Sequence, residues 1–339
     1  MPDSKRGNDM VYVKRIIKAL IFTAGLIFLL VVASQIFVPK NNTEEDGMDY
    51  FVANGFQGEK ENSVDVLFIG DSEFYSSIVP LQMWNDAGYT GYNCGTGGQP
   101  LSYSLALLQR SLNKQSPKVL FLETNAIYRD QSLAKVAYTM AGECLPILRY
   151  HDRWKILKGK DFTETPDYNW SDNDKGYRFY TEVKPPENIN HMVPSDESES
   201  ICRANRICVS AIKDLCDKNG IKLILVSIPS TSNWNYPRHN GVAKLAEELD
   251  CEFLDLNLLP EECPIDWNAD TRDRGDHLNY AGAQKVTAYL TSYLTEHHLV
   301  ESHKGDPYYA NWDECYDKFM TDTVGAGKEA PQDMVETVD

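Results

Sequence analysis

The block Gly70-Asp71-Ser72-Glu73, which contains a serine, directly follows an apolar run. Residues 64–69 (VDVLFI) precede it and predict a buried strand. In open α/β sheets, ligands bind where a strand ends and the next helix begins. The same block would also serve as an ordinary helix cap, so Ser72 alone does not define a site.

The base that such a serine needs is offered far downstream by His277, which is expected to open the last predicted helix. Three aspartates, at positions 270, 273 and 276, lie within seven residues of it. A serine becomes a useful nucleophile only beside a base, and an acid must orient that base. Serine, histidine and aspartate together would perform acyl chemistry.

Two further motifs follow predicted strands. The turn 94–99 (CGTGGQ) is rich in glycine, which lets backbone N–H groups approach a developing oxyanion. Asn125 ends the run Leu122-Glu123-Thr124-Asn125 and could donate its side-chain amide into the same hole. Each motif also reads as a plain turn, but all four would converge on one edge of one sheet.

Strand and helix patterns alternate along the chain, which favours an α/β fold with a parallel sheet and helices on both faces. The predicted strands are 64–69, 91–94, 118–122, 221–228 and 252–256. The predicted helices are 101–112, 201–218, 242–249 and 281–294.

These motifs resemble those of the SGNH (GDSL-type) hydrolases. The resemblance implies a three-layer α/β/α flavodoxin-like fold, a Ser-Asp-His triad and an oxyanion hole. Ser72 matches the family's serine, Gly95 the glycine of its second block, Asn125 the asparagine of its third and His277 the histidine of its last. The resemblance implies neither a metal nor a cofactor.

The last block departs from the family pattern, because Arg274 stands three residues before His277, where the family has aspartate. The acid is then Asp273 or Asp276. Asp273 is favoured because the side chain of an adjacent residue has difficulty folding back onto the imidazole.

The N-terminus predicts a membrane anchor. Residues 1–18 carry five basic and two acidic residues, and residues 19–38 are uncharged and apolar, long enough to span a bilayer. The positive-inside rule puts residues 1–18 in the cytoplasm and the remainder outside the cell membrane. A cleaved signal peptide is the alternative. The whole chain carries 33 basic and 50 acidic residues, a net charge of −17, which argues against nucleic acid as a partner.

The remaining chain divides into a linker at 39–61, a hydrolase-like domain at 62–298 and an acidic tail at 299–339, expected to be disordered beyond about residue 320. Residues 129–200 are expected to form an insertion near the site. Within it, a glycan groove could be lined by Arg149, His151, Arg153, Trp154 and residues 175–180. Of the eight cysteines, Cys208, Cys216 and Cys251 are expected to be free thiols.

A narrower resemblance concerns function. The runs around residues 66–104, 117–125 and 275–287 are similar to membrane-anchored SGNH-like proteins, among them the D-alanyl-lipoteichoic-acid biosynthesis protein and the alginate and peptidoglycan O-acetylation proteins. That implies a serine esterase or O-acyltransferase that acts on acyl groups, with acetyl as the expected one, of a cell-envelope polysaccharide, with a multi-pass membrane-bound O-acyltransferase (MBOAT) as partner. A general secreted esterase or lipase and a non-catalytic accessory protein are the alternatives.

Overall fold

Five short parallel strands form one sheet in the computed structural model, which describes residues 3–327. The strand order is β2-β1-β3-β4-β5, and all five predicted strands are confirmed. Their bounds are β1 (Val66–Gly70), β2 (Gly91–Gly95), β3 (Val119–Glu123), β4 (Lys222–Ser227) and β5 (Glu252–Asp255).

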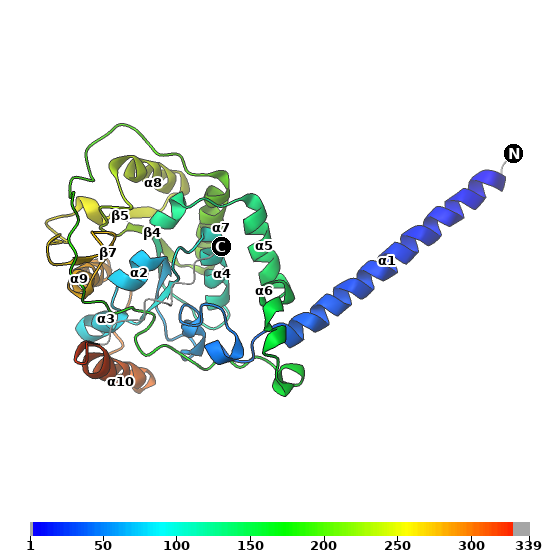
Figure 1. Ribbon diagram of the computed structural model, residues 1–339, viewed down its shortest axis with the longest axis horizontal. Coiled ribbons are helices and arrows are strands. Elements are labelled where there is room, and N and C mark those ends of the chain that lie inside the picture. The colour runs from blue at the N-terminus through cyan, green and yellow to red at the C-terminus, as the bar shows by residue number, and fades with distance from the viewer. Residues whose placement is uncertain (1–2, 328–339) are drawn as a thin grey trace.

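Helices cover both faces of the sheet, which gives the three-layer α/β/α arrangement predicted from the sequence (Figure 1). Leu67 and Ile69 of β1 pack toward α4 (Leu101–Ser111), α7 (Arg203–Asn219) and α8 (Tyr236–Leu249). Phe68, which points to the opposite face, packs among residues of α2 (Ser72–Ser77), α3 (Pro80–Ala87) and α9 (Tyr280–Glu296). This alternation follows from the two-residue period of a strand.

The segment before α9 differs from its prediction. His277 does not open the last helix but lies in β7 (His277–Leu278), which pairs antiparallel with β6 (Thr271–Arg272). The helix begins at Tyr280 because the side chain of Asn279 caps it, accepting a hydrogen bond from the backbone N–H of Gly282.

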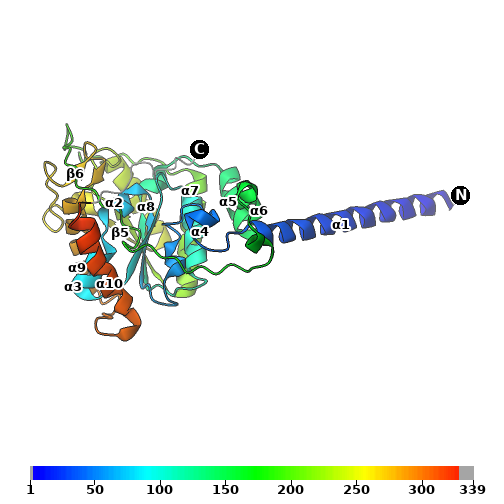
Figure 2. The same ribbon diagram turned by 60° about the horizontal axis from the view of Figure 1, so that its bottom comes forward.

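The N-terminal helix α1 (Asp3–Phe37) projects away from the domain in both views (Figures 1 and 2). Its stretch Tyr12–Phe37 has 26 residues and is long and apolar enough to cross a membrane. The same properties suit a membrane anchor or a signal sequence.

Residues 39–61 were expected to be a linker, but they pack on the domain. They contain two short 3-10 helices, η1 (Glu44–Asp46) and η2 (Gly55–Gly58). Phe56 is fully buried, and its ring lies edge-on to Tyr92 of β2 with centroids 6.2 Å apart. The polar composition of residues 39–61 suggested a linker, but a few apolar residues are enough to attach a short segment to a core.

The short helix η3 (Asn125–Tyr128) precedes the insertion. The insertion contains α5 (Leu133–Cys144), α6 (Ile147–Tyr150), η4 (His151–Lys155) and η5 (Gly159–Phe162). No helix or strand follows until α7, although this stretch includes buried residues such as Tyr177 and Phe179. Between β5 and β6 lies one short helix, η6 (Leu256–Leu258).

The expected acidic tail is ordered through the described residues. It forms η7 (Pro307–Tyr309), α10 (Ala310–Lys318) and the π-helical η8 (Phe319–Val324), so disorder from about residue 320 is wrong for the described part; residues 328–339 lie outside it. Trp312 of α10 is fully buried, with its ring centroid 5.8 Å from that of Trp84 in α3.

All eight cysteines are free thiols, as expected for Cys208, Cys216 and Cys251. Cys208 and Cys216 face the sheet from α7, where they fill space as small apolar side chains.

The packing of Trp312 predicts that α10 stabilises the domain. Trp312→Ala should lower the free energy of unfolding by about 3–5 kcal/mol, since it removes a large buried side chain and leaves a cavity. Chemical denaturation of both proteins measures the difference. Glu314→Ala, on the exposed side of the same helix, is the control and should change stability by less than about 0.5 kcal/mol.

Candidate active site

Ser72 and His277 meet at the carboxyl edge of the sheet. Ser72 is the first residue of α2, directly after β1, and its Oγ lies 2.8 Å from Nε2 of His277. The other ring nitrogen, Nδ1, lies 2.8 Å from Oδ2 of Asp273. The hydrogen-bond network therefore fits a ring that donates from Nδ1 to Asp273 and accepts at Nε2 from the serine hydroxyl.

A tight turn brings Asp273 onto the ring from four residues upstream. Asp273, Arg274 and Gly275 all have positive φ, at 46°, 66° and 82°. The turn lets Oδ1 of Asp273 accept the backbone N–H of His277 at 2.9 Å while Oδ2 receives the ring. Two consecutive non-glycine residues in the left-handed region are costly, so the surrounding contacts must hold this conformation.

Asp276 lies farther from the imidazole. Its Oδ2 is 3.6 Å from Nδ1 of His277, beyond hydrogen-bonding distance, and its Oδ1 accepts a hydrogen bond from the side-chain amide of Asn233. The geometry thus pairs the ring with Asp273, the residue that the sequence favoured, although Asp276 remains nearby.

Arg272 supports the charge on Asp273. Burial raises the pKa of Asp273, but the hydrogen bond from His277, the charge of that ring and the guanidinium of Arg272 outweigh it, so the pKa lies below its usual value. Arg272 donates from Nη1 to Asp273 at 3.0 Å and from Nη2 to Ser76 at 2.9 Å, and its guanidinium stacks 3.8 Å from the ring centroid of Tyr180.

Gly95 lies beside the start of α2. It pairs with Gly70 in the β1–β2 register, and a Cβ on Gly95 would approach the carbonyl oxygen of Asp71 to 3.1 Å. Gly70 is even more constrained, because a Cβ there would lie 2.3 Å from Cβ of Glu123. The two glycines allow the backbone of β1, β2 and β3 to close around Ser72.

Asn125, at the start of η3 after β3, is buried near the same edge. Its Nδ2 donates to Oδ2 of Asp71 at 3.3 Å, which occupies one of the two amide hydrogens, and its Oδ1 accepts from Arg238 at 3.4 Å. The structure therefore brings both predicted oxyanion residues to the edge where Ser72 lies.

Asp71 caps α2 and ties these elements together. The side chain is fully buried; its Oδ1 accepts the backbone N–H of Glu73 at 3.0 Å, and its Oδ2 accepts from Nε and Nη2 of Arg129 at 3.0 and 2.5 Å. Arg129, from the insertion, thus neutralises a carboxylate directly next to the serine.

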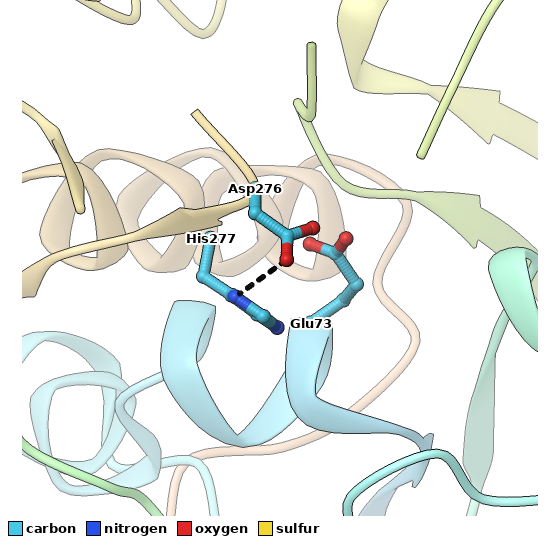
Figure 3. A group of neighbouring side chains, drawn as sticks. All are labelled: Glu73, Asp276 and His277. Atoms are coloured by element: carbon cyan, nitrogen blue, oxygen red, sulfur yellow. Dashed lines mark ion pairs between the residues drawn. The ribbon is translucent and has the colours of Figure 1, made fainter. Parts of the chain in front are cut away.

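Glu73 is a second buried carboxyl at the site. It points toward Asp276 beside the ring of His277, and ligand atoms of all three residues lie within 4.8 Å of one another (Figure 3). Asn233 donates to Oε1 of Glu73 at 2.8 Å and also to Asp276, whereas Oε2 of Glu73 has no hydrogen-bond partner. Burial, and then the charge of Asp71, raise the pKa of Glu73 well above its usual value.

Two carboxyl groups and an imidazole this close together could suggest a cation site. Both nitrogens of the His277 ring already have partners, in Ser72 and Asp273, and Asn233 bridges the two carboxyl groups. Burial and the charge of Asp71 raise the pKa of Glu73, which reduces the repulsion between its carboxyl group and that of Asp276.

A cleft of about 530 Å³ reaches Gly95 between the residues after β2, residues 44–53 and the insertion; Ser72 and His277 are not among the residues that line it. Arg149, Arg153, Arg178 and Tyr180, from the expected glycan groove, line it. Other members of that expectation do not. His151 and Trp154 are exposed outside it, and Lys175 is buried in an ion pair with Glu59. The remaining lining includes Tyr50, Phe51, Tyr75, Gly95, Thr96 and Tyr150.

Sequence reasoning missed Arg129, Asn233, Arg272 and the buried state of Glu73. Glu73 carried a usable signal, since a charged residue stands where the family motif has leucine. Arg272 stands next to the favoured acid. Neither Arg129 nor Asn233 gave a signal in the sequence, because only the fold brings these residues close to Ser72.

No family model and no curated protein matches the chain. Similar solved structures include a putative acylhydrolase from Bacteroides fragilis, with 15% identity over 75% of this chain and 97% of that chain and a TM-score of 0.37. A GDSL-like lipase from Bacteroides thetaiotaomicron has 15% identity, 68% and 88% coverage and a TM-score of 0.33. A lipase/acylhydrolase from Enterococcus faecalis has 10% identity over 69% of this chain and 96% of that chain, with a TM-score of 0.38. At this identity and TM-score, the likeness carries no argument about activity.

The buried carboxyl of Glu73 predicts a pH-dependent stability. Because its pKa is raised in the folded state, the folded protein holds a proton that the unfolded chain releases, and stability falls as pH rises above the usual glutamate range. Glu73→Gln removes this loss. Above about pH 5, the difference in free energy of unfolding between Glu73→Gln and the wild type should therefore shift in favour of the mutant. The shift is up to about 1.4 kcal/mol per pH unit, until Glu73 ionises in the folded state.

Denaturant unfolding of the two proteins from pH 5 to pH 9 measures the gap. Glu314→Gln, on an exposed position of α10, is the matched control. A gap that stays constant with pH would show that Glu73 is already ionised when folded.

Proposed function

We propose that this protein is a serine esterase or acyl hydrolase whose nucleophile is Ser72. The observation that carries the proposal is the continuous hydrogen-bonded chain from Ser72 Oγ through His277 to Asp273, with 2.8 Å at each step. This arrangement is the one that acyl transfer through a serine requires: nucleophile, base and orienting acid in contact.

In the first step, Ser72 Oγ attacks the carbonyl carbon of an acyl ester while Nε2 of His277 takes the hydroxyl proton. Asp273 holds the ring with Nδ1–H toward itself and stabilises the imidazolium that forms. His277 then gives the proton to the departing alcohol, which leaves an acyl group on Ser72. Water, or a sugar hydroxyl, attacks that acyl group with His277 again as base.

The charge that develops on the carbonyl oxygen needs donors. The backbone N–H groups of Ser72 and Gly95 and the second amide hydrogen of Asn125 are the candidates, since all three residues lie at the same sheet edge. A donor of this kind typically contributes about 10²–10³ in rate. Because Asp71 holds Asn125 by one hydrogen bond, the amide is oriented before substrate binds.

We further propose that the substrate is an acyl group, acetyl in the first place, on a cell-envelope polysaccharide, and that the enzyme either removes or transfers it. The lining of the cleft supports this proposal. Its aromatic rings could stack on sugar faces, and its charged groups could form hydrogen bonds with sugar hydroxyls. With α1 as a single-pass anchor in the cell membrane and a cytoplasmic N-terminus, the site would lie on the outer side. A multi-pass O-acyltransferase (MBOAT) as partner follows from the sequence resemblance alone.

A non-catalytic accessory protein is the competing proposal. Its main support was the unusual spacing between acid and histidine. The turn at residues 273–275 offers a physical explanation for that spacing, because it brings Asp273 to the ring from four positions away. A general secreted esterase or lipase is the other alternative; it would act on small esters without affecting polysaccharide acylation.

The catalytic proposal predicts that the full chain hydrolyses a small acetyl ester such as p-nitrophenyl acetate. Ser72→Ala should lower kcat by at least about 10³-fold, since the nucleophile is lost. Release of nitrophenol, followed with wild type and mutant at equal concentration, measures this. Equal turnover by the two proteins would exclude Ser72 as nucleophile, whereas activity in neither would favour the accessory protein or a selective transferase.

The two aspartates beside His277 should differ in their effect. Asp273→Asn should lower kcat by about 10²–10⁴-fold because the amide no longer fixes the reactive tautomer of the ring. Asp276→Asn should lower it by less than about tenfold, since Asp276 makes no hydrogen bond with the ring at 3.6 Å. The same assay compares the matched pair, and a reversed order would identify Asp276 as the orienting acid.

A further inference from the structure

The carboxyl end of α1 is fixed to the insertion by polar contacts. The backbone N–H of Ile147 donates to Oγ of Ser34 at 3.2 Å, and Nη1 of Arg153 donates to the carbonyl of Phe37 at 2.5 Å. Ser34 and Arg153 are both buried. The direction in which α1 leaves the domain is therefore set by its contacts with α6, η4 and η5.

The part of α1 that is free of the domain is shorter than a bilayer requires. Residues 19–33 are the uncharged residues between Lys18 and the first buried residue, Ser34. These 15 residues rise about 22 Å at 1.5 Å each. The hydrocarbon core is about 30 Å thick and needs about 20 residues. A span that begins at Ala19 therefore ends near Val38, so the domain surface around Ser34–Val38 lies at the level of the outer lipid.

That surface carries exposed apolar side chains. Trp154 belongs to η4 and Phe162 ends η5; we call these two residues the aromatic patch. Ile156, which follows η4, lies between them in the sequence. Trp154 and Phe162 are 64% and 63% exposed, and both short helices contact α1. The neighbouring α6 lies at the domain end of α1 in both views (Figures 1 and 2). Such large apolar groups in water are unfavourable, whereas tryptophan is enriched at the membrane–water interface.

We propose that the aromatic patch lies in the outer interfacial layer of the membrane and holds the domain against the lipid. The proposal rests on one part of the proposed function, the anchoring by α1, and not on the hydrolase chemistry. Arg153 contacts α1 and also lines the cleft that reaches Gly95. The docked domain therefore has one side of its cleft next to the membrane surface, where a membrane-associated substrate would arrive.

The patch fits uncharged lipid regions rather than an anionic headgroup. The three lysines between Trp154 and Phe162 are each paired with a nearby carboxylate, so little positive charge from these residues is left for phosphate. The nitrogen–oxygen distances are 3.7 Å for Lys155–Asp152, 2.8 Å for Lys158–Glu45 and 2.6 Å for Lys160–Asp46.

Tryptophan fluorescence of the full chain in phosphatidylcholine vesicles tests the proposal. Among the six tryptophans, Trp154 is exposed, and the other five are buried or partly buried. Vesicles are prepared with acyl chains brominated near the glycerol end or near the methyl end. Bromine should quench Trp154 mainly from the shallow position, and Trp154→Ala should remove most of this quenching. Trp267→Ala, from the segment between η6 and β6, is the matched control and should retain it.

Flotation of the same vesicles separates the possible failures. A chain that floats, but whose quenching is unchanged by Trp154→Ala, would overturn the patch and leave the anchor intact. A chain that does not float would overturn both the anchor and the patch, while the Ser72 assay would still decide the hydrolase chemistry. Quenching that appears only with added anionic lipid would also contradict the proposal, because it would assign the contact to charge.

Discussion

A parallel sheet exists in a folded protein only if both of its faces are covered, and this constraint determines where the site forms. Strands β1 and β3 are buried at every position, so the chain must return helices to each side. The last of these, α9, closes the face that α2 and α3 also cover. The hairpin that leads into α9 thereby carries His277 to Ser72, 205 residues away in sequence. Packing of apolar faces, rather than attraction between the site residues, brings the two groups together.

Three buried carboxyl groups lie around that meeting point, and their charge is only partly balanced. Asp71, Glu73 and Glu123 are all buried near the serine, and only some of this charge is neutralised. Arg129 pairs with Asp71, and backbone N–H groups of Asn125 and Ala126 donate to Glu123. For Glu73, burial and neighbouring charge raise the pKa, which favours the protonated form. The pKa of Asp273 shifts in the opposite direction, since His277 and Arg272 favour its charged form. The environment thus lowers the pKa of the acid that contacts the His277 ring and raises the pKa of the carboxyl group next to Ser72.

The sheet could be predicted because its strands are short continuous apolar runs that end at glycine or polar residues, as at Ile69–Gly70 and Leu122–Glu123. The four candidate motifs could be expected at one edge for the same reason. The turn at Asp273 could not be predicted, because its left-handed backbone depends on tertiary contacts rather than on residue preference. Residues 39–61 were misjudged because their composition is polar, although Phe56 attaches them to the core. Residues 320–327 were misjudged for the same reason, although Phe319, directly before them, is buried. Arg129 and Asn233 act at the site through long-range contacts, which no local pattern reveals.

The central claim is that His277 activates Ser72 for attack on an acyl group. Labelling with a fluorophosphonate, which reacts with serines activated in this way, tests it most directly. Intact mass should show one phosphonyl group for each chain, and peptide mapping should find it on Ser72. His277→Gln, which retains the serine but removes the base, should slow labelling by orders of magnitude. An adduct that persists in Ser72→Ala, or equal labelling rates with and without His277, would contradict the claim.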